Sequence, residues 1–183
     1  MEALAWAVFL VAWFAWCYPF VFRAPHNQKR GSITVALPTR IGLLLESSGI
    51  ILAVSVRSAM PPGWARLIPA VILAFLAIWM AWSAVRHLGK QFRVHAGLYE
   101  DHELITTGAY SIVRHPIYAS LLGMLLMTIL ILTPWTWALL ALVLFVVGTE
   151  VRVRTEDKLL ESRFGDEFRK YRSRVRAYIP WVR

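Results

Sequence analysis

Cysteine is almost absent from this 183-residue chain. Cys17 is the only one, which excludes a disulfide within the chain and a zinc cluster built on thiolates. It lies inside an apolar run, so we interpret it as a packing residue.

Acidic residues are also scarce. Eleven aspartates and glutamates stand against 20 lysines and arginines, which gives a formal net charge of +9. Such an excess could indicate a nucleic-acid ligand. The basic residues, however, are concentrated between or after apolar runs, where membrane-topology signals are found. We therefore predict no nucleic-acid partner.

Long apolar segments are what the chain has in abundance. Apolar residues make up 58% of it, with nine tryptophans, and a soluble domain of this length rarely carries so many. We predict an all-α integral membrane protein with one domain over residues 1–183. Five segments are candidate transmembrane helices: 3–22, 41–56, 67–85, 117–132 and 135–151.

The first segment lacks the features of a secretory signal. It follows Met1-Glu2 rather than a basic stretch, and it contains no small-residue cleavage site. A helix over 3–22 would rise about 30 Å, enough to cross the hydrocarbon core. At the other end of the series, only Thr133-Pro134 separates the last two segments, so we predict that these form a tight helical hairpin.

The distribution of lysine and arginine predicts the orientation in the membrane. Eighteen of the 20 lie in residues 23–40, 86–114 and 152–183, and the other two are Arg57 and Arg66. Five spans place the termini on opposite sides, and basic loops stay in the cytoplasm. The N-terminus is therefore predicted outside, and the C-terminus in the cytoplasm.

The C-terminal tail has a different periodicity. Apolar residues recur at helical spacing, with basic residues between them. We predict an amphipathic helix that ends before Pro180, with Tyr178 and Trp181 as interface anchors. The same charge distribution places the connection 86–116 and the tail 152–183 in the cytoplasm. The apolar positions of the helix are Leu160, Phe164, Phe168, Tyr171 and Val175.

Two polar clusters mark the start of the fourth segment and the end of the fifth. They are Arg114-His115-Pro116-Ile117-Tyr118 and Arg152-Val153-Arg154-Thr155-Glu156-Asp157. A hairpin through the bilayer would return both to the same membrane face, so they predict one reaction site. Taken singly, each residue has a simpler explanation. A proline is favoured in a first helical turn, histidine and tyrosine can lie at the headgroups, and the two acids could be solvated.

Two acids lie within apolar segments, where an ionisable group is costly unless it is paired or functional. For Glu150, Arg152 and Arg154 are possible partners. For Glu46, we expect a hydrogen bond with Ser47 or Ser48, or a polar cavity between helices.

Four of the five histidines lie between residues 86 and 116. No pair has the spacing of a helical metal motif, and neither thiolates nor a dense set of carboxylates accompany them. We predict no metal.

The motifs Gly108-Ala109-Tyr110, Arg114-His115-Pro116-Ile117-Tyr118 and Arg152 with Glu156-Asp157 resemble the isoprenylcysteine carboxyl methyltransferase family. The resemblance extends through Phe164-Gly165 and Tyr171 to Ile179-Pro180 and covers roughly residues 86–181. Two positions depart from the family pattern. Asp157 stands where many members have glutamate, and His95 stands where the eukaryotic enzymes tend to have glutamine.

The resemblance implies S-adenosylmethionine at the cytoplasmic face, under a cap formed by the connection 86–116 and the tail 152–183, with S-adenosylhomocysteine as product. Arg152 would face the carboxylate of a lipophilic or prenylated acceptor that enters from the bilayer, and Arg114 is a second catalytic candidate. Glu156 would hold a polar group of the cofactor. The other cofactor-binding residues implied are His95, His102, Leu104, Ile105, Tyr110, His115, Pro116, Ile117 and Tyr118.

The chemistry of methyl transfer suits these residue types. A carboxylate acceptor is already a nucleophile, so the site needs no strong base. It must align the two reactants and exclude water, and an arginine can orient a carboxylate through paired hydrogen bonds. If the arginine bound the carboxylate too tightly, the carboxylate would become a weaker nucleophile.

Three alternatives remain open. A lipid-amine or phospholipid N-methyltransferase would need a base, for which His95, His102 or His115 could serve. A sterol-type reductase that uses NADPH has a related helical pattern. A non-catalytic scaffold could hold anionic membrane lipid through the basic tail.

Overall fold

The computed structural model describes residues 1–23, 37–59, 61–89, 103–180 and 182. The regular secondary structure of the described residues is helical, apart from one isolated parallel bridge between Val113 and Arg176. The helices, in order, are α1 (Glu2–Tyr18), α2 (Leu37–Ser55), α3 (Trp64–Leu88), α4 (Pro116–Ile131) and α5 (Trp135–Arg174). A π-helical turn, η1 (Pro19–Arg23), follows α1, and a 3₁₀ turn, η3 (Gly108–Ser111), precedes α4.

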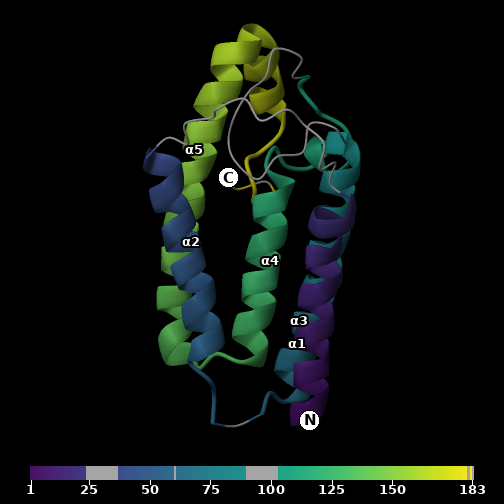
Figure 1. Ribbon diagram of the computed structural model, residues 1–183, viewed down its shortest axis with the longest axis vertical. Coiled ribbons are helices and arrows are strands. Elements are labelled where there is room, and N and C mark those ends of the chain that lie inside the picture. The colour runs from purple at the N-terminus through teal and green to yellow at the C-terminus, as the bar shows by residue number, and fades with distance from the viewer. Residues whose placement is uncertain (24–36, 60, 90–102, 181, 183) are drawn as a thin grey trace.

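The prediction of an all-α membrane protein is confirmed within these residues. Four helices, α1 with η1, α2, α3 and α5, are long and apolar enough to cross a membrane, and α4 is a shorter apolar helix of 16 residues. Figure 1 shows all five running along one bundle axis. Each expected span overlaps one of these helices: the first continues from α1 into η1, the fifth is the first part of α5, and Val56 and Leu132 lie one residue beyond α2 and α4.

Small side chains dominate the buried face of helix α3. On α3, the alanines from Ala70 to Ala84 are buried, whereas Phe75 and Leu76 are exposed. Lipid is as apolar as leucine, so membrane helices gain little from burying large side chains and pack closely through small ones. The exposed apolar side chains therefore indicate a lipid-facing surface.

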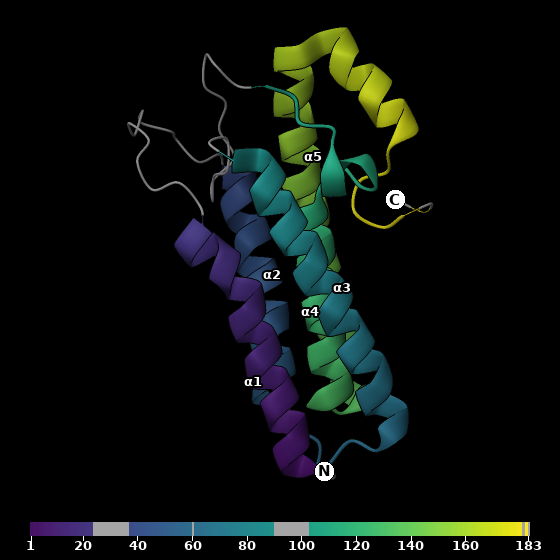
Figure 2. The same ribbon diagram turned by 90° about the vertical axis from the view of Figure 1, so that its right-hand side faces the viewer.

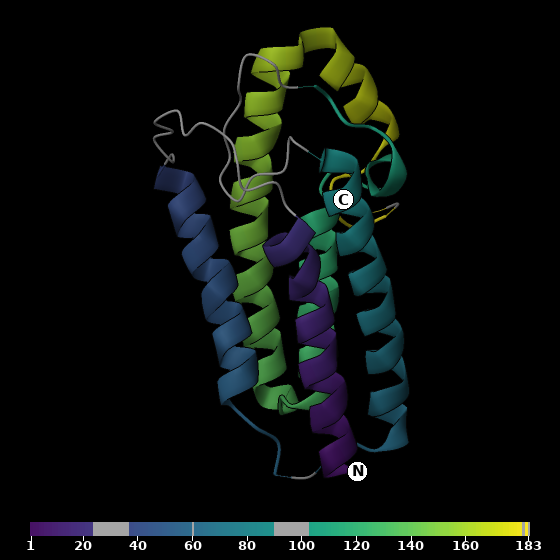
Figure 3. The ribbon, with the colours of Figure 1, turned by 45° about the vertical axis from the view of Figure 1, so that its right-hand side comes forward.

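The last two spans are joined by a short turn, as expected, but they separate beyond it. Only residues 132–134 connect α4 to α5, yet α5 packs most extensively against α2, and α4 against α3. Figures 1 and 3 both show α2 beside α5. The turn lies at the N-terminal end of the bundle, where the Arg66 guanidinium donates to the carbonyls of Ile129 and Thr133, each at 2.9 Å.

Glycines bring α2 and α5 into close contact. A Cβ on Gly42 would lie 2.8 Å from the carbonyl oxygen of Gly148, and one on Gly49 would lie 2.6 Å from the carbonyl oxygen of Ala141. The two backbones therefore touch where any side chain would separate them.

We expect Gly148→Ala to lower the free energy of unfolding by about 1–3 kcal/mol, the usual cost of overpacking. The new methyl group would lie 2.5 Å from the Gly42 carbonyl oxygen and 2.7 Å from the Glu46 nitrogen. Thermal unfolding in detergent measures the effect. Gly63→Ala is the control, because a Cβ there meets nothing within 4 Å. Equal melting temperatures for the two variants would contradict the close contact.

Helix α5 does not end with the fifth span. It continues to Gly165, where φ 50° and ψ −119° break the helix, and a second arm runs to Arg174. After Val151 the sequence changes from apolar to charged. The helix nevertheless continues, because arginine, glutamate, leucine and lysine all favour helical backbone. Figure 2 shows the second arm turning back toward the bundle. On this arm, Phe168 and Tyr171 are buried, as the predicted apolar face requires.

Candidate functional site

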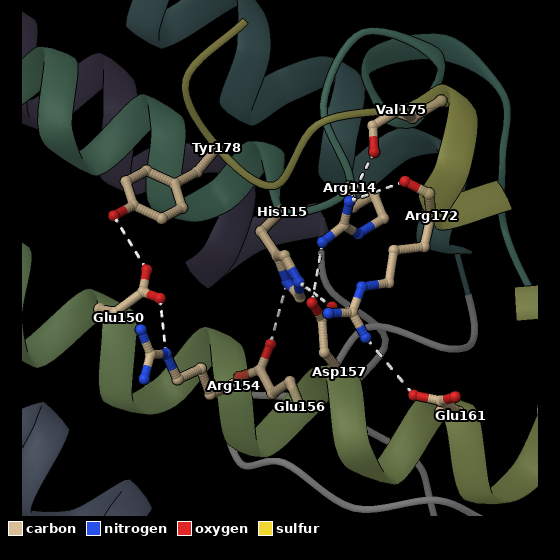
Figure 4. A network of polar contacts seen from close by, with 10 residues as sticks. All are labelled: Arg114, His115, Glu150, Arg154, Glu156, Asp157, Glu161, Arg172, Val175 and Tyr178. Atoms are coloured by element: carbon tan, nitrogen blue, oxygen red, sulfur yellow. Dashed lines mark hydrogen bonds and ion pairs between the residues drawn. The ribbon is translucent and has the colours of Figure 1, made fainter. Parts of the chain in front are cut away.

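The two polar clusters predicted to converge do meet, at the end of the bundle opposite the N-terminus (Figures 1 and 4). After the second arm of α5, the tail runs beside the residues that precede α4. The backbone nitrogens of Arg114 and His115 donate to the carbonyls of Arg176 and Ala177, each at 2.7 Å. The tail thereby fixes the start of α4.

Arg114 joins three segments of the chain. Its Nη2 donates to Asp157 Oδ2 at 2.8 Å, and its Nη1 donates to the Val175 carbonyl at 2.5 Å (Figure 4). The side chains of Arg114 and Asp157 are only 4% and 7% exposed. The Arg114 side chain thus binds helix α5 and the tail that follows it, which fits a positioning residue better than a group that contacts the acceptor.

His115 is held on both ring nitrogens by carboxylates. Its Nε2 lies 2.8 Å from Asp157 Oδ1, and its Nδ1 lies 3.3 Å from Glu156 Oε2. Burial by itself would lower the pKa of His115, but the hydrogen bonds with Asp157 and Glu156 outweigh it and raise the pKa above the usual value. The geometry therefore favours the imidazolium, which donates from both nitrogens.

Glu156 is the accessible acid of the cluster. The Tyr118 hydroxyl donates to its Oε1, and His115 contacts its Oε2. Its side chain is still 24% exposed, against 7% for Asp157. The two neighbouring acids therefore differ: Asp157 is enclosed by Arg114 and His115, whereas Glu156 is oriented by two partners and can still be reached from outside.

Arg152 lies between this cluster and helix α2. Its Cζ is 4.8 Å from the centre of the Tyr118 ring, and its Nη1 donates to Glu46 Oε2 at 2.5 Å. Its Nε is buried without a hydrogen-bond partner among the described residues. Part of the guanidinium is thus bound, and one buried donor has no acceptor.

The hydrogen-bond partners of Glu46 are residues of α5 rather than the serines predicted for it. Its carboxylate accepts hydrogen bonds from Arg152 and from Thr149 Oγ1, the latter at 2.8 Å, whereas Ser48 donates to its own helix at Leu44. The contact of α2 with α5 brings an acid and a cation together that lie 106 positions apart in the sequence. The predicted partner Arg154 is present for Glu150, with Arg154 Nε 2.7 Å from Glu150 Oε1, and the Tyr178 hydroxyl adds a second contact at 3.3 Å.

The implied apolar cofactor residues lie beside the polar cluster. Ile105, Tyr110 and Ile117 pack together against α3, and the Tyr110 carbonyl accepts a hydrogen bond from Tyr171 at 2.5 Å. Leu104 is half-buried, and Pro116 is buried at the first position of α4. His95 and His102 lie outside the described residues. Among the described residues, no three histidine, cysteine or acidic side chains form a metal site.

Sequence reasoning missed two residues at this site. Thr149 fixes the Glu46 carboxylate, and Glu46 fixes Arg152. The cost of an acid within an apolar span marked Glu46 as a paired residue, but no local pattern identified its partner. Thr149 carried no such signal.

The sequence matches the isoprenylcysteine carboxyl methyltransferase (ICMT) family over residues 70–162, just over half of the 183 residues. A protein-S-isoprenylcysteine O-methyltransferase of Schizosaccharomyces pombe is 35% identical over 115 residues, which cover 60% of this chain and 48% of that protein. A probable enzyme of the same name from Oryza sativa subsp. indica is 30% identical over 122 residues, or 66% of this chain and 60% of that protein.

The matches extend beyond proteins with that name. The cobalt-zinc-cadmium resistance protein CzcN of Cupriavidus metallidurans is 38% identical over 82 residues, which cover 44% of this chain and 37% of that protein. This chain thus spans less than two thirds of the length of each of these relatives. The family match contains both polar clusters and the whole of α4, and on this basis the chain belongs to the isoprenylcysteine carboxyl methyltransferase family.

Proposed function

We propose that this protein transfers a methyl group from S-adenosylmethionine to the carboxylate of a lipophilic acceptor of the isoprenylcysteine type, at the cytoplasmic membrane face. The observation that carries the proposal is the meeting of Arg152, Tyr118 and Glu156 at one end of a membrane bundle. Membership of the family supports it.

The residues around Glu156 fit the cofactor. Its carboxylate is oriented by Tyr118 and His115 and remains partly exposed, so it can accept a hydrogen bond from an amine or hydroxyl of the ligand. The packed group of Ile105, Tyr110 and Ile117 provides an apolar wall next to it. When bound, S-adenosylmethionine supplies a methyl group activated by the positive charge on sulfur.

On the acceptor side, Arg152 supplies the cation. Its Nε, which has no hydrogen-bond partner among the described residues, can donate to a carboxylate oxygen, and the Tyr118 ring 4.8 Å from its Cζ limits how the guanidinium turns. The carboxylate needs no deprotonation, so Arg152 serves to orient it. Because Arg152 follows the apolar span of α5, a bound lipid chain can remain in the bilayer while its carboxylate reaches the guanidinium.

The structure gives no support to His115 as the base of an amine methyltransferase. Both of its ring nitrogens are hydrogen-bonded to carboxylates, and its pKa is raised. A protonated imidazole with both nitrogens occupied cannot accept a proton from an acceptor amine. Carboxylate methylation needs no base, and it therefore fits the described part of the cluster, which contains His115, better.

Binding and transfer test the proposal directly. We expect the purified protein to bind S-adenosylmethionine in calorimetry, and Glu156→Ala to weaken that binding by about tenfold, the loss of one charge-assisted hydrogen bond. Glu167→Ala, at an exposed position of the second arm of α5, is the control. A radiolabelled transfer assay would then compare prenylcysteine, phospholipid and fatty-acid acceptors. Absence of saturable cofactor binding at millimolar concentration would refute the proposal, and transfer only to phospholipid amines would replace its acceptor.

A further inference from the structure

Glu46 is far in sequence from both polar clusters, yet it contacts the guanidinium proposed to bind the acceptor. It is fully buried in α2, only 1% exposed. Its Oε1 accepts from Thr149 and its Oε2 from Arg152. Both oxygens are occupied, so the carboxylate has one orientation.

The path of the Arg152 side chain is equally restricted. A Cβ on Gly42 would lie 2.5 Å from Arg152 Cγ, so the aliphatic stem lies directly across the glycine on α2. Beyond the stem, Nη1 is bound to Glu46 and the Tyr118 ring lies 4.8 Å from Cζ. The guanidinium is held by its Nη1 end, while its Nε has no partner among the described residues.

We propose that Glu46 weakens the binding of the acceptor carboxylate to Arg152 and so keeps that carboxylate reactive, an inference that rests on the proposed function. An arginine that serves one carboxylate alone binds it tightly and stabilises the charge that the nucleophile must give up. With Glu46 on the same guanidinium, the acceptor meets a cation whose charge is already partly balanced, and it is also repelled by a second carboxylate nearby. Affinity for the free acid falls, and the bound carboxylate stays more nucleophilic.

A purely structural ion pair would behave differently. Its loss would weaken all ligands alike, through a looser site. Loss of a charge-tuning residue changes only the binding of ligands that carry the negative charge. Comparing an acid with its own methyl ester separates the two, because the ester keeps the lipid and the thioether but loses the charge.

The test measures binding of N-acetyl-S-farnesylcysteine and of its methyl ester, each tritiated, to protein without cofactor. Glu46→Gln keeps the shape but removes the charge: its amide oxygen can accept from Arg152, and its NH2 group can donate to the Thr149 hydroxyl. We expect the acid-over-ester preference to rise about tenfold in this variant, with ester binding unchanged. In the transfer assay, KM for the acid and kcat should both fall.

Two further variants sharpen the result. Thr149→Val removes a hydrogen bond to Glu46 but no charge, so the acid-over-ester preference should stay within about twofold of the wild type. Ser48→Ala is the neutral control, because the Ser48 hydroxyl donates to the Leu44 carbonyl of its own helix. If Glu46→Gln does not fold, Glu46→Asp replaces it. The shorter side chain draws the charge away from Nη1 and should shift the preference in the same direction by less.

Failure of this inference is distinguishable from failure of the proposed function. A wild type that methylates the acid, with a Glu46→Gln preference that is unchanged or reduced, overturns the role of Glu46 alone. A wild type that neither binds nor methylates the acid overturns the proposed function, and the inference with it.

Discussion

Arg152→Ala should reduce kcat/KM for a prenylcysteine carboxylate by on the order of a hundredfold or more, while changing S-adenosylmethionine affinity by about twofold at most. Removing one partner of a desolvated charge pair typically costs about 2–5 kcal/mol, and the acceptor carboxylate would lose its cation. Cofactor affinity should be nearly unchanged, because Glu156 keeps the Tyr118 and His115 contacts that orient it. Steady-state transfer kinetics and calorimetry measure the two quantities.

The matched control is Arg154→Ala, two positions further along the same helix, with a side chain that is 70% exposed. Arg152→Ala also leaves the Glu46 carboxylate buried without its cation, which destabilises the fold. The double variant Arg152→Ala, Glu46→Gln removes that charge and should melt at a higher temperature than Arg152→Ala, without regaining transfer. Equal losses of transfer and of cofactor affinity would instead assign Arg152 to the cofactor site or to the fold.

The largest loss of stability is expected from Asp157→Ala. Asp157 balances Arg114 at 2.8 Å and His115 at 2.8 Å, in a cluster where all three side chains are at most 7% exposed. Removing one member of a buried charge network costs about 3–5 kcal/mol, because its partners stay buried without compensation. Arg114 also anchors the tail through the Val175 carbonyl, so the start of α4 should loosen and transfer should be lost as well.

Thermal unfolding in detergent, followed by the transfer assay at low temperature, checks both losses. Asp166→Ala is the control, since Asp166 forms an exposed pair with Arg169 within α5, and such surface pairs contribute little. Asp157→Glu keeps the charge and should be the milder of the two Asp157 variants. If Asp157→Ala unfolds at the same temperature as Asp166→Ala, the buried cluster does not hold the tail.

Much of the fold follows from the sequence because each membrane-spanning helix can be recognised from its own stretch of sequence. A run of apolar residues long enough to cross the hydrocarbon must be helical, since no water there satisfies its backbone, and the five predicted segments coincide with α1 to α5. The kink at Gly165 was less accessible. Helix-favouring residues continue past Val151, and only a glycine with positive φ marks where α5 turns back.

The candidate site could likewise be predicted only in part. The meeting of Arg114 and His115 with Glu156 and Asp157 was predictable, because two spans joined by a short turn must return the chain to its starting face. The functions of the individual residues were not. The sequence motif made Arg114 a catalytic candidate, whereas the contacts of Arg114 with Asp157 and the Val175 carbonyl give it a positioning role.

By itself, the sequence determined the number and positions of the apolar segments, the asymmetry of basic charge and the end of the bundle at which the polar residues gather. Each of these depends on composition or on periodicity over a few turns. Only the tertiary structure decided that α5 packs on α2 rather than on α4, and hence that Arg152 is bound by Glu46. The rotation of one helix about its axis, and its shift along a neighbouring helix, depend on glycine contacts between distant segments, such as Gly42 and Gly148. A contact of this kind has no local pattern in either segment.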